Sequence, residues 1–268
     1  MTHKLRRKPH KIKTKRSIFK TKSFWYVILV VVLLVVAIYF VIFFDKVQIK
    51  NIIISGNSKA PANQIESLVA NEISKKVLFL PERSIFLVDT ATVKNLVLES
   101  FPVVGDVKVS RKFFDSLEIV INEREARAIF CQNIETENTC SYIDETGTAF
   151  EEAKLTETQS SLIVRRYDNN KVSLGEQAIT KETLGYILKA KKGLTDKYGV
   201  LVDSADIASD IRLNIKTNEG WEVYFNLSAD MDLQIAKLIL LLEKEITKES
   251  RGSLQYIDLR FQDRAYYK

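Results

Sequence analysis

Histidine is nearly absent from this 268-residue chain, and the two that occur, His3 and His10, both lie in the first ten residues. The body of the chain therefore has no imidazole to serve as a general base or as a metal ligand. This absence excludes Ser-His-Asp catalysis, Cys-His catalysis and histidine-bound metals from the body. Glycine and proline are also scarce, at nine and four residues. No Gly/Pro-rich linker, internal repeat or low-complexity segment follows the N-terminal tail.

Acidic residues are absent from residues 1–23, which carry ten lysines and arginines. The rest of the chain holds 30 basic and 34 acidic residues, so the tail alone makes the formal charge +6 and the pI about 9.1. A mildly acidic body does not suit a basic nucleic-acid-binding domain. The tail could bind nucleic acid by itself, but a cationic tail beside a membrane segment more often fixes topology and contacts anionic lipid. We therefore expect no nucleic-acid partner.

Residues 24–44, FWYVILVVVLLVVAIYFVIFF, contain no charged side chain and no polar group except the tyrosine hydroxyls. A helix of this length spans roughly 30 Å, the hydrocarbon core of a bilayer. A buried core helix is the weaker alternative, because the run is long and follows a cationic tail. A cleaved signal peptide is also disfavoured, since its apolar region is shorter and ends in small residues. The sequence predicts an uncleaved signal anchor, with the N-terminus cytoplasmic because Lys and Arg precede it in excess.

The two cysteines agree with an extracytoplasmic body. Cys131 and Cys140 enclose the polar segment QNIETENT, which suits a loop better than a core. In an oxidising compartment this pair predicts a disulfide, which for so short a loop stabilises by about 2–3 kcal/mol. Two free thiols, in an organism that does not oxidise its surface proteins, are the alternative. Zinc is disfavoured, since no second ligand pair or histidine is near.

The first part of the body predicts a β-α-α-β-β module. A strand at 47–54 precedes a helix that starts near Pro61, and a second helix begins after Asp89 or Thr90. Two strands follow, one with its valines and one with its isoleucines and leucine on the inner face. The residues expected inside are Ile65, Leu68, Val69, Ile73, Val93, Leu96, Val97, Val103, Val107, Val109, Leu117, Ile119 and Ile121.

The rest of the body predicts a second α+β module. Residues 211–216 and 221–227 alternate strictly and are joined by the turn Asn218-Glu219-Gly220, which predicts a hairpin with Trp221 and Phe225 on its core face. Helices are expected at Thr180–Tyr198 and Asp230–Thr247. The expected buried residues of the second helix include Leu233, Ala236, Leu240 and Ile246.

Paired carboxylates are the catalytic candidates that the sequence marks; Ser/Lys catalysis needs only two common residues and stays open, but nothing marks a candidate for it. Asp230-Met231-Asp232 is a D-x-D triplet, which in some membrane-anchored glycosyltransferases holds a nucleotide-sugar metal ion. The triplet also opens a predicted helix, where acids cap free N–H groups, and no Gly-rich phosphate cradle is present. We interpret it as a helix cap. The pairs Asp144/Glu145 and Glu151/Glu152 are interpreted as solvated loop acids, because neighbours on a strand point to opposite faces.

Several segments together resemble the FtsQ/DivIB family of bacterial division proteins, whose first extracytoplasmic domain is a polypeptide-transport-associated (POTRA) domain. Each segment is weakly specific alone, but their order and spacing are shared with the family. They are IKNIIISGN (49–57), FPVVGDVKVSR (101–111), SLEIVINEREARAI (116–129), SYIDETGTAF (141–150) and LQYIDLRFQDRAYYK (254–268).

The resemblance implies an α+β fold with four parts: a basic cytoplasmic tail (1–23), a transmembrane helix (24–44), a POTRA domain (45–126) and an extracytoplasmic β-rich domain (127–268). The last is expected to be mostly antiparallel sheet with helices packed on it. The implied function is a non-enzymatic scaffold of the divisome in the cell membrane at the division septum, without cofactor or metal. The implied partners are small single-pass coiled-coil proteins of the FtsB and FtsL type and, through them, the septal peptidoglycan synthase complex.

The partner site is expected at the C-terminal strand. Residues 254–261 alternate apolar and polar side chains, so one face turns inward, and the strand should form a sheet edge because little sequence follows it. Such an edge can accept a partner strand, and the family resemblance implies docking here and on the preceding helix. No tail follows Lys268, which departs from the family pattern. The expected partner-binding residues are Tyr256, Asp258, Arg260, Phe261 and Tyr266; the alternative is that Phe261 is core and Arg260 a solvated charge.

Two other classes remain open at this point. A membrane-anchored envelope enzyme, such as a glycosyltransferase or glycan hydrolase, would share the basic tail and single anchor. A POTRA-bearing export or assembly component would use the module as a docking site, but such components usually add a membrane barrel or further POTRA copies.

Reporter fusions test the predicted topology. A fusion after residue 44 should be active only with a reporter that works outside the cytoplasm, and one before residue 23 only with a cytoplasmic reporter. Activity of a cytoplasmic reporter at the C-terminus would contradict both the topology and the compartment argued for the disulfide.

Overall fold

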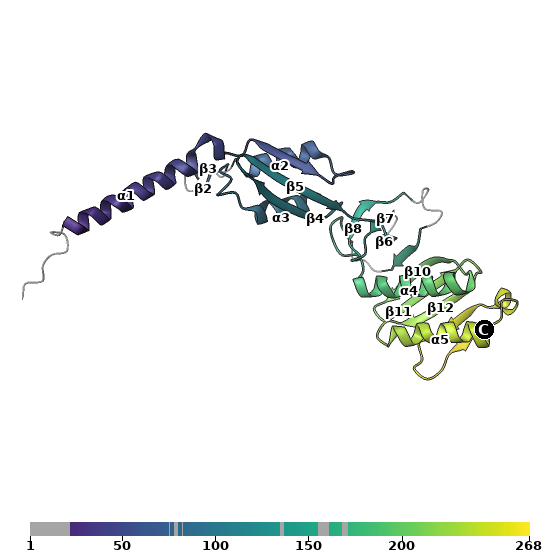
Figure 1. Cartoon of the computed structure of the whole chain (residues 1–268). Coiled ribbons are helices and arrows are strands. Elements are labelled where there is room, and N and C mark those ends of the chain that lie inside the picture. Colours follow the sequence, from purple (N-terminus) through teal and green to yellow (C-terminus); the bar gives the residue numbers. More distant parts are fainter. Residues whose placement is uncertain are drawn as a thin grey trace, which may run out of the picture. The chain divides into compact units, whose positions relative to one another are not determined.

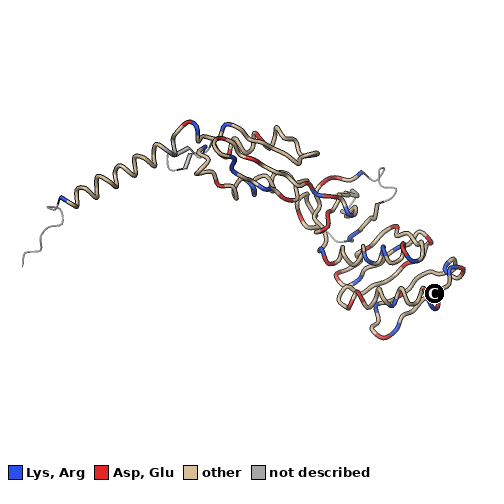
Figure 2. The backbone as a smooth tube through the Cα atoms, viewed as in Figure 1, with Lys and Arg blue, Asp and Glu red and all other residues tan. Residues whose placement is uncertain are grey.

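The computed structural model describes residues 22–74, 76–77, 80–81, 83–134, 137–154, 161–167 and 171–268. Its first elements are helix α1 (Lys22–Phe43) and the short 3-10 helix η2 (Asp45–Val47). The apolar span Lys22–Phe40 within α1 is long enough to cross a membrane, and none of it is buried against other residues. A core helix would be mostly buried, so the core-helix alternative fails. Figure 2 shows α1 uncharged between a basic first residue and the charges after its end.

The next elements follow the predicted β-α-α-β-β order, except that a short strand pair, which was not predicted, lies between the two helices (Figure 1). Asp89 caps the second helix, since its carboxylate accepts from the Ala91 N–H at 2.9 Å. The three strands form a sheet of order β1-β5-β4, and a separate pair joins β2 to β3. The bounds are β1 Asn51–Ser55, α2 Ala62–Glu72, β2 Lys76–Val77, β3 Leu80–Pro81, α3 Thr90–Ser100, β4 Val104–Lys112 and β5 Ser116–Glu123.

Most of the residues expected inside this module are buried, but β4 differs. Val104 and Val107 are fully buried, whereas Val103 and Val109 are only half-buried. Burial along β4 does not alternate strictly, because its two buried valines are three residues apart, whereas the prediction assumed that every second residue lies on the inner face. Leu68 and Leu96 are likewise half-buried at the margins of their helices. The side chains that do lie inside include Ile65, Val69, Ile73, Val93, Val97, Leu117, Ile119 and Ile121.

A nine-stranded mixed sheet forms the second module, in the order β14-β13-β12-β11-β10-β9-β6-β7-β8. Neighbours are parallel at β12/β13, β10/β9 and β9/β6 and antiparallel elsewhere, which confirms a mostly antiparallel sheet. The bounds are β6 Ala128–Ile134, β7 Glu137–Ile143, β8 Ala149–Glu152, β9 Ile163–Arg166, β10 Val202–Ser209, β11 Arg212–Thr217, β12 Glu222–Asn226, β13 Tyr256–Asp258 and β14 Tyr266–Tyr267.

Two helices, α4 (Lys181–Tyr198) and α5 (Met231–Lys244), cover one face of this sheet (Figure 1). Their inner side chains share one hydrophobic core with Trp221 and Phe225 of the predicted hairpin, both fully buried. Thr180 caps α4, because its side-chain hydroxyl accepts from the Thr183 N–H at 3.1 Å.

The inward stripe of α5 differs from the prediction. Leu233, Ala236 and Leu240 are exposed, and only Ile246, beyond the helix, is buried as expected. The reason is Gln234, whose buried amide accepts from the Asn226 N–H and donates to the Asn226 carbonyl, both at 2.9 Å. These two bonds orient α5 so that the side of the helix that carries Gln234 faces the end of β12. The residues on that buried face are Met231, Gln234, Ile235, Leu238 and Leu242.

The β7–β8 hairpin explains the spacing of the motif SYIDETGTAF. The buried Asp144 carboxylate accepts from the Thr146 N–H at 2.8 Å and the Thr148 N–H at 3.1 Å, which fixes the turn. Gly147 has φ +79°, and a Cβ there would lie 2.0 Å from the Ile179 carbonyl oxygen. Phe150 then enters the hairpin as a buried residue. The hairpin thus requires a hydrogen-bond acceptor at position 144, a glycine at position 147 and an apolar residue at position 150.

By compactness the chain divides into two units. One comprises Met1–Asn51 with Ile73–Val88 and Arg111–Leu117, and the other comprises Ile52–Glu72, Asp89–Ser110 and Glu118–Lys268. The domain boundary expected between residues 126 and 127 stays a prediction.

Glycine substitutions test the hairpin. Gly147→Ala should lower the free energy of unfolding by more than about 1 kcal/mol, because it adds both an unfavourable φ and a backbone clash. Gly185→Ala is the matched control, since it lies inside α4 with open space around it and should stabilise by up to about 1 kcal/mol. Urea unfolding of the detergent-solubilised chain measures both. Equal effects of the two substitutions would contradict this description of the turn.

Candidate partner-binding site at the C-terminal strands

The terminal strands are held by a short backbone ladder. β13 runs parallel to β12, with Tyr256 opposite Glu222, and β14 runs antiparallel to β13, with Tyr266 opposite Asp258. Lys268 extends this ladder, because its N–H donates to the Tyr256 carbonyl at 3.2 Å and its carbonyl accepts from the Tyr256 N–H at 3.4 Å. The C-terminal residues are therefore part of the sheet.

The strand predicted at residues 254–261 is shorter in the structure, and it does not form the edge of the nine-stranded sheet. Strand β13 covers only Tyr256–Asp258 of the predicted 254–261, and β14 lies on its outer side. Because the chain leaves the strand before Phe261, that side chain does not continue the inward alternation of Ile257 and Leu259. Phe261 is 46% exposed, so the alternative of a core Phe261 is wrong. Among the described residues the sheet edge is β14, Tyr266–Tyr267.

Asp258 and Arg260 form a two-bond ion pair. Arg260 Nε donates to Asp258 Oδ1 at 2.9 Å and Nη2 donates to Oδ2 at 2.6 Å, while the Arg260 backbone N–H also binds Oδ1. Burial acts to raise the pKa of the Asp258 carboxyl, but the hydrogen bonds from Arg260 and the charges of Arg260 and Arg212 outweigh it and lower the pKa. The same hydrogen bond raises the pKa of Arg260. Arg260 is therefore fixed in direction, and is not a freely solvated charge.

An aromatic pair lies beside this ion pair. Tyr224 stacks on Tyr256 with ring centroids 5.6 Å apart and planes 19° apart. Both alternate with buried neighbours on their strands, which places them on the face of the sheet away from α4 and α5. The guanidinium carbons of Arg212 and Arg260 lie 5.0 and 5.6 Å from the Tyr224 ring centroid, within cation–π range. Burial, together with the nearby Glu222 carboxylate, raises the pKa of the Tyr224 hydroxyl.

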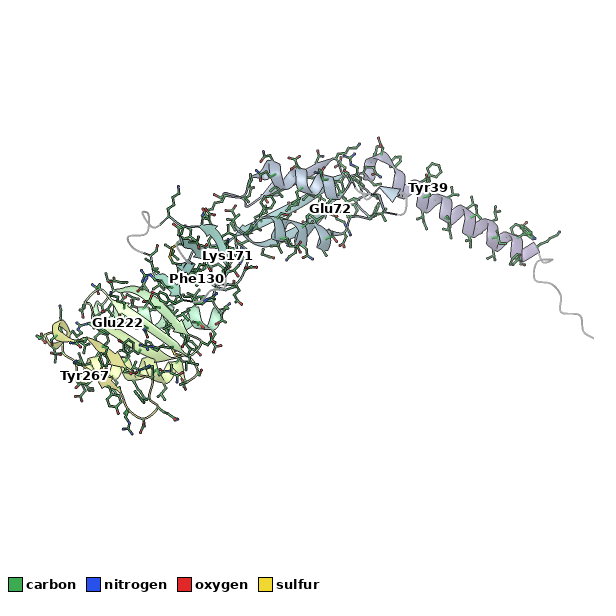
Figure 3. The ribbon with its side chains drawn as sticks, turned by 180° about the vertical axis from the view of Figure 1, so that it is seen from behind. Tyr39, Glu72, Phe130, Lys171, Glu222 and Tyr267 are labelled. Carbon is green, nitrogen blue, oxygen red and sulfur yellow. A yellow bond between two sulfur atoms is a disulfide. The ribbon has the colours of Figure 1, made fainter. Side chains whose placement is uncertain are left out.

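A second aromatic contact follows the turn after β13. Phe261 and Tyr266 meet edge to face with centroids 5.2 Å apart, and both side chains are close to half exposed. Lys237 of α5 ties this turn to the helix, because its Nζ donates to the Phe261 carbonyl at 3.2 Å and also to the Gln262 carbonyl. Figure 3 labels Tyr267 of β14 and Glu222 of β12 in the same C-terminal part of the molecule.

The five predicted partner residues are thus brought close together but in two groups. Tyr256, Asp258 and Arg260 gather around Tyr224, whereas Phe261 and Tyr266 pair beyond the turn. Two further residues of this region were not predicted. Arg212 is diagonal to Tyr224 in the β11–β12 register, which the hairpin alternation in the sequence could have indicated. The position of Lys237 depends on tertiary packing, and no sequence signal indicates it.

Asp144, Asp230 and Asp232, three of the carboxylates considered for catalysis, have structural partners. Asp230 caps α5 by accepting from the Leu233 N–H at 2.9 Å, as interpreted from the sequence, and Asp232 pairs with Lys189 at 2.5 Å. Asp144 is not a solvated acid, because it is buried and forms an ion pair with Arg124 in addition to its turn bonds. Its carboxyl pKa is lowered despite burial, by Thr146, Thr148 and Arg124. Within the described ranges, no three His, Cys, Asp or Glu residues could hold a metal ion.

Cys131 and Cys140 are opposite each other on β6 and β7 and form a disulfide. The pair packs with Ile129 in a small apolar cluster that is separate from the main core. The disulfide therefore joins the two strands of one hairpin, and it takes no part in the terminal site.

Two family models match most of the chain. Residues 47–124 match the model described as "POTRA domain, FtsQ-type". Residues 133–260 match "Cell division protein FtsQ/DivIB, C-terminal", and this range includes β12, β13 and the Asp258–Arg260 pair. No curated protein matches the chain.

The Asp258–Arg260 pair predicts a pH-dependent stability. Asp258→Asn should lower the free energy of unfolding by about 1–3 kcal/mol at pH 7, since it removes charge-assisted hydrogen bonds of a buried carboxylate. The Asp258 carboxyl has a lower pKa in the folded protein than in the unfolded chain, so its ionised form stabilises the folded state at pH values above the unfolded pKa of about 4. This stabilisation is lost as the pH falls below that value. The difference from the unmodified chain should therefore shrink from pH 7 to pH 3.5. Asp263→Asn, in an exposed pair with Arg264, should change stability little at either pH; a loss equal to that of Asp258→Asn would contradict the assignment.

Proposed function

The chain belongs to the FtsQ/DivIB family of cell division proteins, and from this membership we propose that it is a non-enzymatic, membrane-anchored organiser of the division septum. Its body lies outside the cytoplasm and binds other division proteins. The partners are small single-pass coiled-coil proteins of the FtsB and FtsL type, and through them the septal peptidoglycan synthase complex. The observation that carries the proposal is the open backbone edge at β14.

The peptide group of Tyr267 supports strand addition at this edge. In an antiparallel pair, residues alternate between those that bond to the partner strand and those that point away from it. Lys268 bonds to Tyr256, so the N–H and C=O of its neighbour Tyr267 point away from β13. Among the described residues no strand lies beyond β14. A partner strand could therefore bind the main chain of Tyr267 directly.

The opposite edge of the sheet is a poorer docking site. The Ala149 N–H of β8 donates to the Glu176 carbonyl at 3.0 Å, and the Ala149 carbonyl accepts from the Gly175 N–H at 2.7 Å. A bridge between Thr148 and Gln177 extends this cover. The chain thus uses its own loop to satisfy the β8 edge, which leaves β14 as the edge for a partner.

Exposed apolar side chains beside β14 support the same location. Leu233 and Leu240 of α5 are 45% and 56% exposed. They lie four residues before and three residues after Lys237, hence on the same side of the helix, and Lys237 bonds to the Phe261 carbonyl. Phe261 and these leucines can provide apolar contacts for a partner whose backbone pairs with Tyr267, in agreement with docking on the terminal region and the helix before it.

Proline substitution at the edge tests the proposal. Tyr267→Pro removes the outward N–H and should abolish co-purification of the FtsB-type partner from membranes, because the ladder to a partner strand then loses its donor. Tyr267→Ala keeps that N–H and should retain most of the partner. Mass spectrometry of the purified complexes identifies and quantifies the bound proteins.

Two controls make this experiment decisive. Thermal unfolding of both Tyr267 variants must match that of the unmodified chain, which separates a lost partner from a lost fold. Arg260→Glu, folded by the same measure, should also weaken binding if the surface around Tyr224 takes part. Normal partner recovery with Tyr267→Pro would overturn strand addition, and recovery of export components in place of division proteins would favour the assembly-component alternative.

A further inference from the structure

Three phenylalanines in the first compact unit are exposed in a way that the partner site does not explain. Phe86 is 46% exposed, Phe113 65% and Phe114 71%, and Leu87 beside them is 37% exposed. Phe86 and Phe113 come from different loops but contact each other, with ring centroids 5.9 Å apart. We call Phe86, Phe113 and Phe114 the aromatic tip. A contiguous exposed apolar group of this kind indicates a binding surface.

Both loops of the aromatic tip are hydrogen-bonded to the segment that leaves α1. The Ile85 N–H donates to the Val47 carbonyl at 2.9 Å, and the Ile49 N–H donates to the Arg83 carbonyl at 2.7 Å. The Lys50 N–H donates to the Asp115 carbonyl at 2.8 Å, directly beside Phe114. The 83–88 and 112–115 loops are therefore fixed to the first residues after the apolar helix.

The distance to the end of α1 is short. Val47 follows Phe43 by four residues, so its backbone lies at most about 14 Å from the last helical residue. The headgroup region of a bilayer adds roughly 5–8 Å to each side of the hydrocarbon core, and a phenylalanine side chain extends further from its own backbone. The aromatic tip is thus held within reach of the surface from which α1 emerges.

The strand directions place the tip at the near end of its sheet. Residues 50 and 51 bond to Asp115, before β5 starts, and a Cβ on Gly56, after β1 ends, would meet the Ile121 carbonyl near the end of β5. β1 and β5 therefore run in the same direction from the same end. Since β1 follows directly after α1 and η2, the turn with Phe113 and Phe114 lies at the end of the sheet that the chain reaches first.

The charge around the tip suits a lipid headgroup layer. Residues 45–50, 83–88 and 111–115, which carry and hold the tip, contain five basic residues and two acids, Asp45 and Asp115. Basic side chains near a membrane surface are attracted to anionic lipid, while aromatic rings prefer the interfacial region. The five basic residues are Lys46, Lys50, Arg83, Arg111 and Lys112.

We propose that the aromatic tip inserts into the interfacial layer of the leaflet into which α1 emerges, and so docks the POTRA domain on the phospholipid surface. The occupant is lipid rather than protein because the tip is bound by backbone hydrogen bonds to the segment that enters the membrane. This contact is independent of the edge at β14. It gives the protein a second membrane attachment, peripheral and aromatic, beside the spanning helix.

Depth measurement in nanodiscs tests the proposal. The full chain is reconstituted at one chain per nanodisc in phosphatidylcholine with phosphatidylglycerol, which removes any second copy or protein partner. Phe114→Cys carries an NBD fluorophore, and the two native cysteines are already joined in a disulfide. Doxyl-labelled lipids should quench this probe several-fold more strongly than the same probe at Ile211→Cys, an exposed position of the other compact unit.

A charged variant separates insertion from mere proximity. In the Phe114→Cys background, Phe86→Asp with Phe113→Asp should reduce lipid quenching to near the Ile211 level. Leu174→Asp with Leu201→Asp, also at exposed apolar positions, is the matched control and should leave quenching unchanged. Weak quenching at residue 114 in the unmodified background would overturn the proposal. Equal quenching at residues 114 and 211, or no effect of the Phe86 and Phe113 substitutions, would overturn it as well.

Discussion

The nine-stranded sheet must satisfy backbone N–H and C=O groups at both of its edges, and it does so differently at each. At β8 the loop around Glu176 supplies the missing bonds, whereas at β14 the peptide group of Tyr267 points away from the sheet. An unsatisfied edge is costly if buried and prone to wrong pairing if exposed. A short edge strand reduces that risk because it offers few groups to an arbitrary partner. In our account, recognition of division proteins depends on this one open edge.

The surroundings of the edge add specificity to the main-chain bonds. A backbone ladder by itself does not distinguish partners, so side chains must. The Asp258–Arg260 ion pair fixes one guanidinium beside the Tyr224–Tyr256 stack, and α5 contributes exposed leucines on the other side of the turn. Neither group forms a catalytic constellation. The fixed arginine, the aromatic stack and the apolar helix face form an interaction surface, which agrees with a division protein that works by assembly.

Local signals in the sequence predicted much of the fold, because caps and alternation are decided by neighbouring residues. Asp89 and Asp230 cap the helices that they were expected to cap, and Leu117, Ile119 and Ile121 lie inside. The predicted buried face of α5 was wrong because that helix is apolar on more than one side. Only the hydrogen bonds of Gln234 to β12 determine which side is buried. The terminal strand was placed in the right region but assigned too many residues. Alternation continues past Asp258 in the sequence, whereas the turn and the pairing with β14 depend on the tertiary structure.

Hydrogen–deuterium exchange of the Tyr267 amide is the most direct test of the central claim. It is measured in the full chain alone and in the chain saturated with the proposed FtsB-type partner, with the Tyr256 amide as an internal reference already bonded in the sheet. Our account predicts that exchange at Tyr267 is fast in the free protein and becomes strongly protected in the complex, while Tyr256 changes little. An unchanged Tyr267 amide in a saturated complex would show that the partner does not pair with this edge.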